Sequence, residues 1–277
     1  GTRKRVLIAA EQLRYVANPN AARLASGRTR TIGVLAPLSG WYAAEVLAGV
    51  EESCAAAGHD VLIGAASPVA RDLIFRGDAH FHQRIDGMLL VDIACTPDGE
   101  HQLAELGMPV VVLGQPLQRV TSVSVDNVHG GALAAQHLLA LGHEAIALVG
   151  GRAHPDTPHH VPTDRHAGFT ATLQHAGAPL RDEYYAHDGG FTIDGGHRAM
   201  QRLLALPRPP TAVFFLSDEM AFGGLQCLRE AGWTAGRDMA VVGFDDHPAS
   251  VAFGLTTVRQ QVRAMGRLAA SLLLSEL

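Results

Sequence analysis

Short apolar segments alternate with helix-forming segments along the chain from residue 31 onward. The apolar segments are β-branched or continuous runs, as is typical of parallel strands buried on both faces. Strands are expected at 31–36, 61–65, 85–91, 109–113, 145–149, 211–216 and 239–244. Helices are expected between them, at 43–57, 100–106, 127–141, 165–176, 196–206, 218–231 and 261–274. This alternation predicts an α/β fold of parallel sheets with flanking helices, arranged as two lobes.

Charge is divided unevenly between the N-terminal segment and the rest of the chain. The 277 residues carry 22 basic and 27 acidic side chains, which gives a formal net charge of -5. Residues 1–30 have a net charge of +6, and the remaining residues have a net charge of −11. A basic segment joined to an acidic body indicates a nucleic acid or another anionic surface as the partner of that segment.

The basic segment also differs in its secondary-structure pattern. Residues 2–14 and 20–26 predict two short helices, and Asn18-Pro19 predicts a turn between them. Residues 28–30 are expected to form an exposed linker to the first strand.

Several classes of protein are excluded or disfavoured. Lys4 is the only lysine, so residues 5–277 contain neither a Walker-type phosphate loop nor a Schiff-base lysine. Among the 30 glycines there is no Gly-x-Gly, which disfavours a dinucleotide-binding enzyme, and there is no G-x-S-x-G or H-E-x-x-H motif. No apolar run approaches the ~18 residues that span a bilayer, so no membrane partner is expected.

The cysteines and the N-terminus favour a cytoplasmic location. The three cysteines are odd in number and form no C-x-x-C pair, which indicates reduced thiols and no zinc site. The N-terminus, as given, does not have the pattern of a secretory signal. The 15 histidines cluster at 80–82 and 154–166, without the partners or spacing of a metal site. We therefore expect no bound metal and no cofactor.

Polar residues directly follow two of the expected strands. Asp245-Asp246 follow one, and Ser217-Asp218-Glu219 follow another. Carboxylates at the carboxyl end of a parallel strand face the crevice in which α/β proteins bind ligands. The alternative is that these residues cap helices. We expect Asp218, which fits the start of the next helix, to be a cap, and Asp245 to contact a ligand.

Arg165 and three aromatic residues are further candidates for ligand contacts. Arg165 opens an expected helix, and its planar guanidinium suits carboxylate or hydroxyl oxygens. The alternative is that Arg165 forms a surface ion pair with Asp164 or Asp182. Trp41 and Tyr42 follow the first strand, and a glycine-rich turn contains a third aromatic, Phe191. Aromatics at such turns either stack on ligands or act as hydrophobic staples.

Eight segments in a fixed order resemble the LacI/GalR family of transcriptional regulators. Each segment alone is weak, but together they cover nearly the whole chain. They are YVANPNAARL (15–24) with TIGVL (31–35), VDNVHGG (125–131), HL (137–138) with GH (142–143), RHAGF (165–169), PTAVF (210–214), SDEMAFG (217–223), VVGFDD (241–246) and LTTVRQ (255–260).

The resemblance implies a specific organisation of the chain. It implies a two-lobed core of periplasmic-binding-protein-like fold, preceded by the remnant of a helical DNA-binding headpiece. Residues 1–30 are then the end of the helix-turn-helix headpiece and the hinge helix. Residues 31–141 and 262–277 are expected to form the N-terminal lobe, and residues 142–261 the C-terminal lobe. The helices that read the major groove are expected to lie outside this sequence.

The resemblance also implies a ligand-responsive regulator and assigns residues to two sites. Such regulators are homodimers that bind operator DNA and an effector held between the lobes. The implied effector site, whose Arg and Asp groups with aromatics suit a sugar, polyol or sugar acid, contains Trp41, Tyr42, His159, Arg165, Phe191, Ser217, Asp245 and Gln260. The implied DNA contacts in the hinge, where Leu24 is the apolar wedge, are Asn20, Ala21, Arg23, Leu24 and Arg28.

Two other functions remain as alternatives. A solute-binding protein of a sugar transport system has the same two-lobed core, but it needs a signal peptide and has no use for a basic N-terminal segment. A sugar-acting enzyme requires a nucleophile and a base at a suitable spacing, and the sequence contains no such pair. The expected function is therefore that of a transcriptional regulator. The resemblance implies that it is a repressor and not an enzyme.

Overall fold

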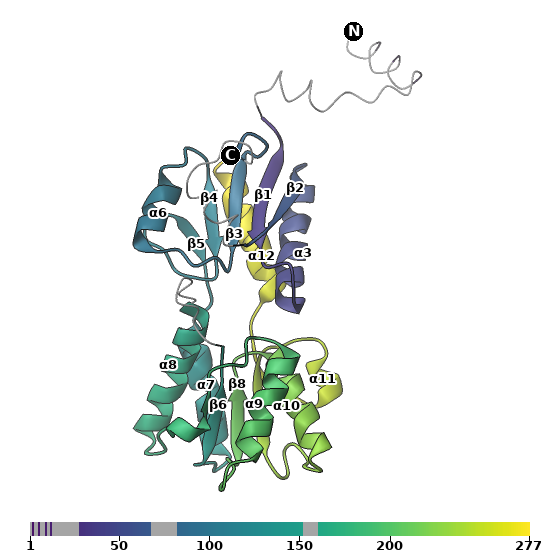
Figure 1. Cartoon of the computed structure of the whole chain (residues 1–277). Coiled ribbons are helices and arrows are strands. Elements are labelled where there is room, and N and C mark those ends of the chain that lie inside the picture. Colours follow the sequence, from purple (N-terminus) through teal and green to yellow (C-terminus); the bar gives the residue numbers. More distant parts are fainter. Residues whose placement is uncertain are drawn as a thin grey trace.

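The computed structural model describes residues 28–67, 82–151 and 160–277, together with residues 2, 5, 9 and 12. These residues form two α/β lobes that are stacked one above the other in Figure 1. Each lobe is built on a five-stranded sheet whose strands pair in parallel. The fold class expected from the alternation of strands and helices is confirmed.

Within the described residues, the first lobe contains a sheet with three helices around it. In spatial order its strands are β2 (Asp60–Ala65), β1 (Thr31–Ala36), β3 (Gly87–Val91), β4 (Val110–Leu113) and β5 (Thr121–Val123). Its helices are α3 (Trp41–Ala56), α6 (Pro97–Ala104) and α12 (Val262–Ser275). The last helix comes from the C-terminal end of the chain, so the two ends of the core belong to the same lobe.

The second lobe has a similar architecture. Its strands, in spatial order, are β10 (Thr256–Arg259), β9 (Ala240–Asp245), β8 (Ala212–Phe215), β6 (Ile146–Val149) and β7 (Tyr185–Ala186). Its helices are α7 (Asn127–Ala140), α8 (His160–His175), α9 (Ile193–Leu204), α10 (Asp218–Glu230), α11 (Ser250–Phe253) and the 3-10 turn η1 (Asp182–Tyr184). The chain passes between the lobes twice within the described residues, between β5 and α7 and between β10 and α12.

The apolar runs are explained by burial on both faces of each sheet. In β1, Ile32 and Val34 point into the core that α3 and α12 cover, whereas Leu35 belongs to the core on the α6 side. Successive side chains of a strand point to opposite faces, so a strand covered on both sides is apolar at every position. All six residues of β1 are buried accordingly.

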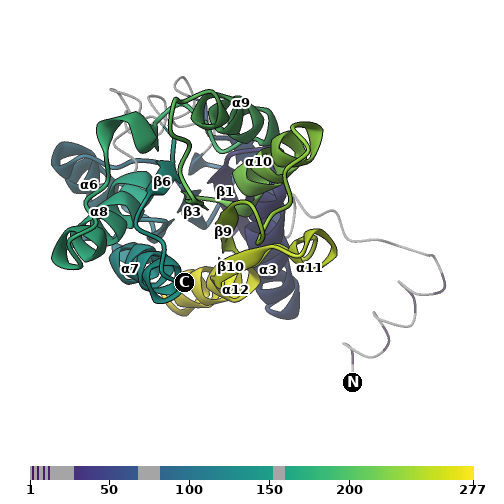
Figure 2. The same ribbon diagram turned by 90° about the horizontal axis from the view of Figure 1, so that it is seen from below.

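Three helix pairs cross at glycines, and Figure 2 shows the members of each pair side by side. A Cβ atom added at any of these glycines would lie only 1.8–2.2 Å from a backbone carbonyl oxygen of the partner helix. The pairs are Gly49 with Gly266 (α3 and α12), Gly131 with Gly168 (α7 and α8), and Gly196 with Gly223 (α9 and α10). Glycine is therefore required here for close approach of two backbones and not for a special dihedral angle.

Most expected elements are confirmed within one to five residues at their ends. All seven expected strands and all seven expected helices are present. The sequence analysis missed β5, β7, β10 and α11, which have two to four residues each. Elements this short contain too few residues to show a periodic pattern, and their conformation depends on their neighbours.

The expected boundary between the lobes is wrong for one helix. Residues 127–141 are expected in the N-terminal lobe. In the structure, α7 packs on α8 and belongs to the second lobe, to whose core it contributes Ala134, Ala135 and Leu138. The apolar face of a helix predicts that the helix packs on a sheet but does not indicate which sheet. The chain passes to the second lobe before α7, not after it.

Other expectations have mixed outcomes. The predicted helices at 2–14 and 20–26 lie outside the described residues, apart from residues 2, 5, 9 and 12. The three cysteines are buried free thiols. Within the described ranges, no helix is long and apolar enough to cross a membrane, and no cluster of histidine, cysteine and acidic side chains has the arrangement of a metal site.

The glycine crossings lead to a prediction about stability. Gly131→Ala places a methyl group against the carbonyl oxygen of Arg165, so α7 and α8 must move apart. We expect a loss of about 2 kcal/mol or more in the free energy of unfolding, measured by urea denaturation. The control is Ala171→Ser, which adds one atom on the exposed face of α8 and is expected to change stability by less than about 0.5 kcal/mol. Equal effects of the two substitutions would contradict the role given to the crossing.

Candidate effector site

A cavity of about 210 Å³ lies between the two lobes. Both lobes line it, and half of its polar residues stand at or just after the carboxyl ends of strands: Asp92, Ser217, Asp245 and Gln260. The carboxyl edge of a parallel sheet is the usual place for a ligand in an open α/β fold. The lining residues are Pro37, Tyr42, Asp92, Gly114, Val125, Asn127, Val161, Pro162, Arg165, Phe191, Ser217, Glu219, Asp245, Gln260 and Met265.

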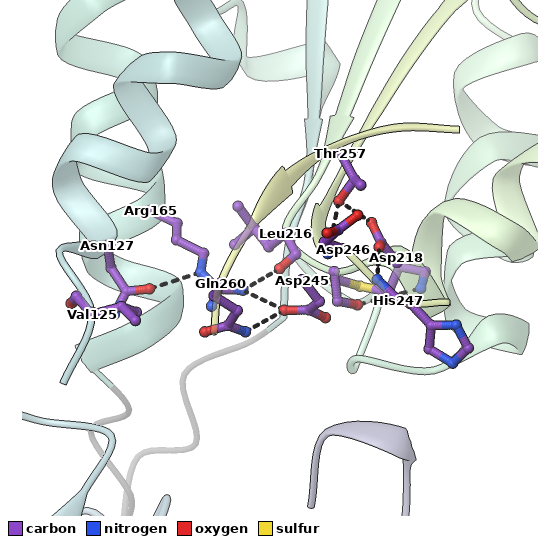
Figure 3. A network of polar contacts seen from close by, with 12 residues as sticks. Val125, Asn127, Arg165, Leu216, Asp218, Asp245, Asp246, His247, Thr257 and Gln260 are labelled. Atoms are coloured by element: carbon purple, nitrogen blue, oxygen red, sulfur yellow. Dashed lines mark hydrogen bonds and ion pairs between the residues drawn. The ribbon is translucent and has the colours of Figure 1, made fainter. Parts of the chain in front are cut away.

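Arg165 stands at the centre of the polar network in Figure 3. Its side chain is buried, its Nε donates to Oδ1 of Asn127 at 2.9 Å, and its Nη1 donates to the carbonyl oxygen of Leu216 at 2.5 Å. The same Nη1 lies 3.7 Å from Oδ1 of Asp245, and the guanidinium carbon lies 3.5 Å from the ring centroid of Phe244. Arg165 is therefore a buried cation that is bonded to the second lobe and not one member of a surface ion pair.

Asp245, the last residue of β9, is held on the other side of this ion pair. Its Oδ1 accepts a hydrogen bond from Nε2 of Gln260 at 2.5 Å, and only 7% of the residue is exposed. Burial raises the pKa of the Asp245 carboxyl to about 7, against the opposing effect of the Arg165 charge. Its φ of 126° is one that residues other than glycine rarely adopt. Such backbone strain is common at ligand sites and costs about 1–3 kcal/mol.

Ser217 lies at the cavity as expected, whereas Asp218 has a role that differs from the expected one. Ser217 lines the cavity, and it is also the N-cap of α10, because its Oγ accepts from the N–H of Met220 at 3.3 Å. Asp218 is therefore not the cap. Its fully buried carboxylate accepts from the N–H of His247, the hydroxyl of Ser250 and the hydroxyl of Thr257, as Figure 3 shows in part.

The three aromatic candidates are placed differently. Tyr42 and Phe191 line the cavity from opposite lobes, and Trp41 does not line it. Phe191 adopts a φ of 56°, and Gly151 leaves room for its ring, since a Cβ there would lie 2.5 Å from the ring edge. Burial, followed by the charge of Asp92, raises the pKa of the Tyr42 hydroxyl well above its ordinary value, so this hydroxyl stays protonated.

Trp41 contacts the other lobe just outside the cavity. Its ring centroid lies 4.6 Å from that of His247, and its backbone N–H donates to Oε1 of Glu219 at 3.3 Å. Gly40, the N-cap residue of α3, has no side chain to satisfy the first N–H groups of this helix. The Glu219 carboxylate from the second lobe takes that role in part and also lines the cavity.

The remaining expected site residues give little information. His159 lies outside the described residues, as do Asn20, Ala21, Arg23 and Leu24 of the expected DNA contacts. Arg28 is described: it is exposed, and its Nη2 donates to the carbonyl oxygen of Leu277 at 2.5 Å. Six of the eight expected effector residues surround one cavity, Trp41 does not line it, and His159 lies outside the described residues.

Two polar lining residues, Asp92 and Asn127, are absent from the expected site, and Glu219 was expected there only as part of the strand-end group Ser217-Asp218-Glu219. Asn127 and Glu219 stand in the first turns of α7 and α10, where capping is the simpler explanation for such residues. Asp92 directly follows β3, so the rule that identified Asp245 applies to it equally. The strand-end position is thus a usable signal for Asp92 as well as for Asp245.

Asp92 is the least compensated charge of the cavity. Its Oδ1 is fully buried and has no hydrogen-bond partner among the described residues. Burial raises the pKa of its carboxyl to about 7, and the Arg165 charge offsets only part of this shift. Its φ of 49° adds local backbone strain.

The raised pKa of Asp92 predicts how stability depends on pH. In the folded chain the carboxyl holds its proton up to about pH 7, whereas its ordinary pKa is 3.8. This contribution to stability is fully present below the ordinary value and is lost as the pH rises through about 7. Asp92→Asn removes the ionisation, so at pH 8 the variant is expected to be more stable than the parent by about 1–3 kcal/mol.

The measurement is the difference between variant and parent in the free energy of unfolding at pH 5 and pH 8. Burial lowers the pKa values of His143 and His166, which gives an opposite pH dependence in both proteins and cancels in this difference. A difference that does not change with pH would show that Asp92 is ionised throughout this range and would contradict the prediction.

Comparisons with known proteins agree on one family. Residues 135–277 match the family model described as "Periplasmic binding protein-like domain". The chain is 34% identical to the HTH-type transcriptional repressor PurR of Erwinia tasmaniensis, over 100% of this chain and 82% of the relative. This relative is a repressor and not an enzyme or a transport protein, which favours the regulator over both alternatives.

Solved structures agree with the sequence comparison. The lac repressor dimer bound to operator and the anti-inducer ONPF superimposes with a TM-score of 0.87 at 25% identity, covering 99% of this chain and 83% of that one. The transcriptional regulator CelR–cellobiose complex superimposes with a TM-score of 0.77 at 30% identity, with coverages of 99% and 83%. The chain therefore belongs to the LacI/GalR family of ligand-responsive, DNA-binding transcriptional regulators.

Proposed function

We propose that this chain is a cytoplasmic, homodimeric repressor whose effector is a sugar, polyol or sugar acid bound in the cavity between the lobes. The observation that carries the proposal is the composition of this cavity. Two aromatic rings, Tyr42 and Phe191, face a cluster of polar groups formed by Arg165, Asp245 and Gln260. Aromatic faces pack on the C–H side of a sugar ring, and charged groups bind its hydroxyls. The complex of a structural relative with cellobiose supports this choice.

The position of the cavity supports a mechanism based on closure of the lobes. An effector that contacts residues of both lobes binds one relative arrangement more tightly than another, and it shifts the equilibrium by that difference alone. Trp41, Glu219 and His247 form contacts between the lobes beside the cavity, and these contacts change when the lobes move. The expected consequence is a change in the spacing of two hinge segments in a dimer, and so in operator affinity.

The N-terminal segment is proposed to contact the operator. Residues 1–30 have a net charge of +6, whereas the core has a net charge of −11. Arg23 and Arg28 are proposed as phosphate contacts, and Leu24 as the side chain that opens a base step in the minor groove. The effector core, with its net negative charge, is expected to remain away from the phosphates.

A pair of adjacent carboxylates tests the effector site. Asp245 lines the cavity, whereas Asp246 is paired with Arg259 on the surface. The test is a thermal-shift screen of sugars, polyols and sugar acids, followed by calorimetry to measure the Kd of the best compound. Asp245→Ala is expected to raise its Kd at least about tenfold, because a hydrogen bond to a charged group is lost. Asp246→Ala is the control and is expected to stay within about twofold of the parent.

The possibility that Asp245→Ala leaves Arg165 unpaired and unfolds the chain is covered by a second variant. Asp245→Asn keeps the shape of the side chain and its hydrogen bond from Gln260, and it is used when the alanine variant does not fold. Equal affinity of the parent and the folded Asp245 variant for the same compound would place the effector elsewhere.

Salt dependence tests the DNA contacts. With the full-length protein and duplexes from the region upstream of its own gene, the logarithm of the association constant is expected to fall linearly with the logarithm of the salt concentration. Arg23→Ala and Arg28→Ala are each expected to reduce the slope by about 1. Arg237→Ala, an exposed arginine of the second lobe, is the control and leaves the slope unchanged. Binding that does not depend on salt would exclude this mode of DNA contact.

A further inference from the structure

Asp92 occupies a position that the chain is built to accommodate. It follows β3 and brings a carboxyl into the cavity from the first lobe, opposite Arg165 of the second lobe. Its Oδ1 lies so close to Gly114 that a Cβ atom there would be 2.3 Å away. Gly114 directly follows β4 and has a φ of 120°. Because it has no side chain, it leaves space for the carboxyl.

The backbone around Asp92 is fixed on both sides. Its N–H donates to the carbonyl oxygen of Leu113 at 2.9 Å, which continues the pairing of β3 with β4. Three residues after Asp92, the backbone of Cys95 is held by the buried side chain of Gln115. This side chain accepts from the N–H of Cys95 at 3.2 Å and donates to the carbonyl oxygen of Cys95 at 3.1 Å. The carboxyl of Asp92 therefore cannot reach another partner by a shift of its loop without breaking these bonds.

The unpartnered Oδ1 has a direct chemical meaning. A buried carboxylate oxygen without a hydrogen bond costs free energy, and native chains keep such groups mainly where a ligand or another group completes them. Above about pH 7 the Asp92 carboxyl is ionised, and an ionised carboxylate only accepts hydrogen bonds. The group that completes Asp92 must then be a donor, such as a hydroxyl or an ammonium group.

The charge balance of the cavity points in the same direction. Among the lining residues that the structure describes, Asp92, Glu219 and Asp245 are acidic and Arg165 is the sole basic residue. The charge of Arg165 is already opposed by Asp245, and two of its donor groups are occupied by Asn127 and Leu216. A carboxylate or phosphate on the effector would face Asp92 and Glu219 without an unpaired cation to offset them.

We propose that the effector is an uncharged or cationic polyhydroxylated molecule that donates a hydrogen bond to Asp92, and that sugar acids are excluded. This inference rests on the proposed function and narrows it, because it removes one of the three effector classes named there. It also assigns specificity to the first lobe: the second lobe supplies the Arg165–Asp245 cluster, and Asp92 selects against negative charge.

The test uses sets of three compounds that share one ring. Each set contains a hexose, its 2-amino derivative and its uronate: glucose, glucosamine and glucuronate, and the three corresponding galacto compounds. Kd values are measured by calorimetry at pH 8 for the parent, Asp92→Asn and a control, Asp60→Asn, which alters an exposed acid at the start of β2. Asp92→Ser serves if Asp92→Asn does not fold.

In the parent, the uronate of the best-binding set is expected to bind at least tenfold more weakly than the hexose or the amino sugar. Asp92→Asn is expected to weaken binding of the hexose at least tenfold and to reduce the discrimination against the uronate by a similar factor. Asp60→Asn is expected to match the parent. An amino sugar that binds more tightly than the hexose identifies an ammonium as the donor, and equal binding identifies a hydroxyl.

Two results would overturn the inference, and they differ in what they say about the proposed function. If a uronate binds more tightly than its hexose and Asp92→Asn does not change this order, the inference fails. The proposed function then stands, provided that Asp245→Ala raises the Kd of the bound compound at least about tenfold. If no sugar, amino sugar or acid binds the parent, the proposed function fails and the inference fails with it.

Discussion

The buried guanidinium of Arg165 is the interaction on which the rest of the cavity depends. A charge at this depth is stable only when oxygen acceptors and an opposite charge surround it, and Asn127, Leu216 and Asp245 provide them. These partners belong to α7, to the end of β8 and to β9, so one side chain fixes three elements of the second lobe relative to α8. The close crossing of α7 and α8 at Gly131 and Gly168 brings the donor to its acceptors. Packing and electrostatics are thus one constraint: a wider crossing would separate Arg165 from Asn127.

The two lobes contribute unequal polar surfaces to the cavity. The polar groups of the second lobe are bonded to one another, as the contacts of Asp245 with Gln260 and of Asp218 with Thr257 illustrate. The first lobe contributes the hydroxyl of Tyr42 and the carboxyl of Asp92, whose Oδ1 has no partner among the described residues. The second lobe thus has a preformed network, and the first lobe has an acceptor without a partner. A ligand completes the hydrogen bonding of both only when the lobes come together.

Sequence reasoning predicted the fold well because its signals are local. Buried parallel strands are apolar at every position, and helices that end at glycine show their boundaries, so β1 and α10 were placed almost to the residue. It also named two residues that line the cavity: Asp245, because it follows a buried strand, and Arg165, because its guanidinium suits carboxylate or hydroxyl oxygens. It could not show that α7 packs in the second lobe, that Ser217 and not Asp218 caps α10, or that Trp41 stands outside the cavity. These facts depend on which surfaces meet in three dimensions, and a single sequence carries no record of that.

The features that define the cavity also lower the stability of the chain. Asp92, Phe191 and Asp245 all have positive φ values, and two of them are carboxyls that burial shifts toward the protonated form. Each feature costs free energy in the unliganded chain, yet their clustering on one cavity matches the pattern of functional sites and not that of random defects. A ligand that satisfies these groups binds the folded chain alone and stabilises it by mass action. Because the strained groups belong to both lobes, that stabilisation acts on the arrangement of the lobes as well as on their folding.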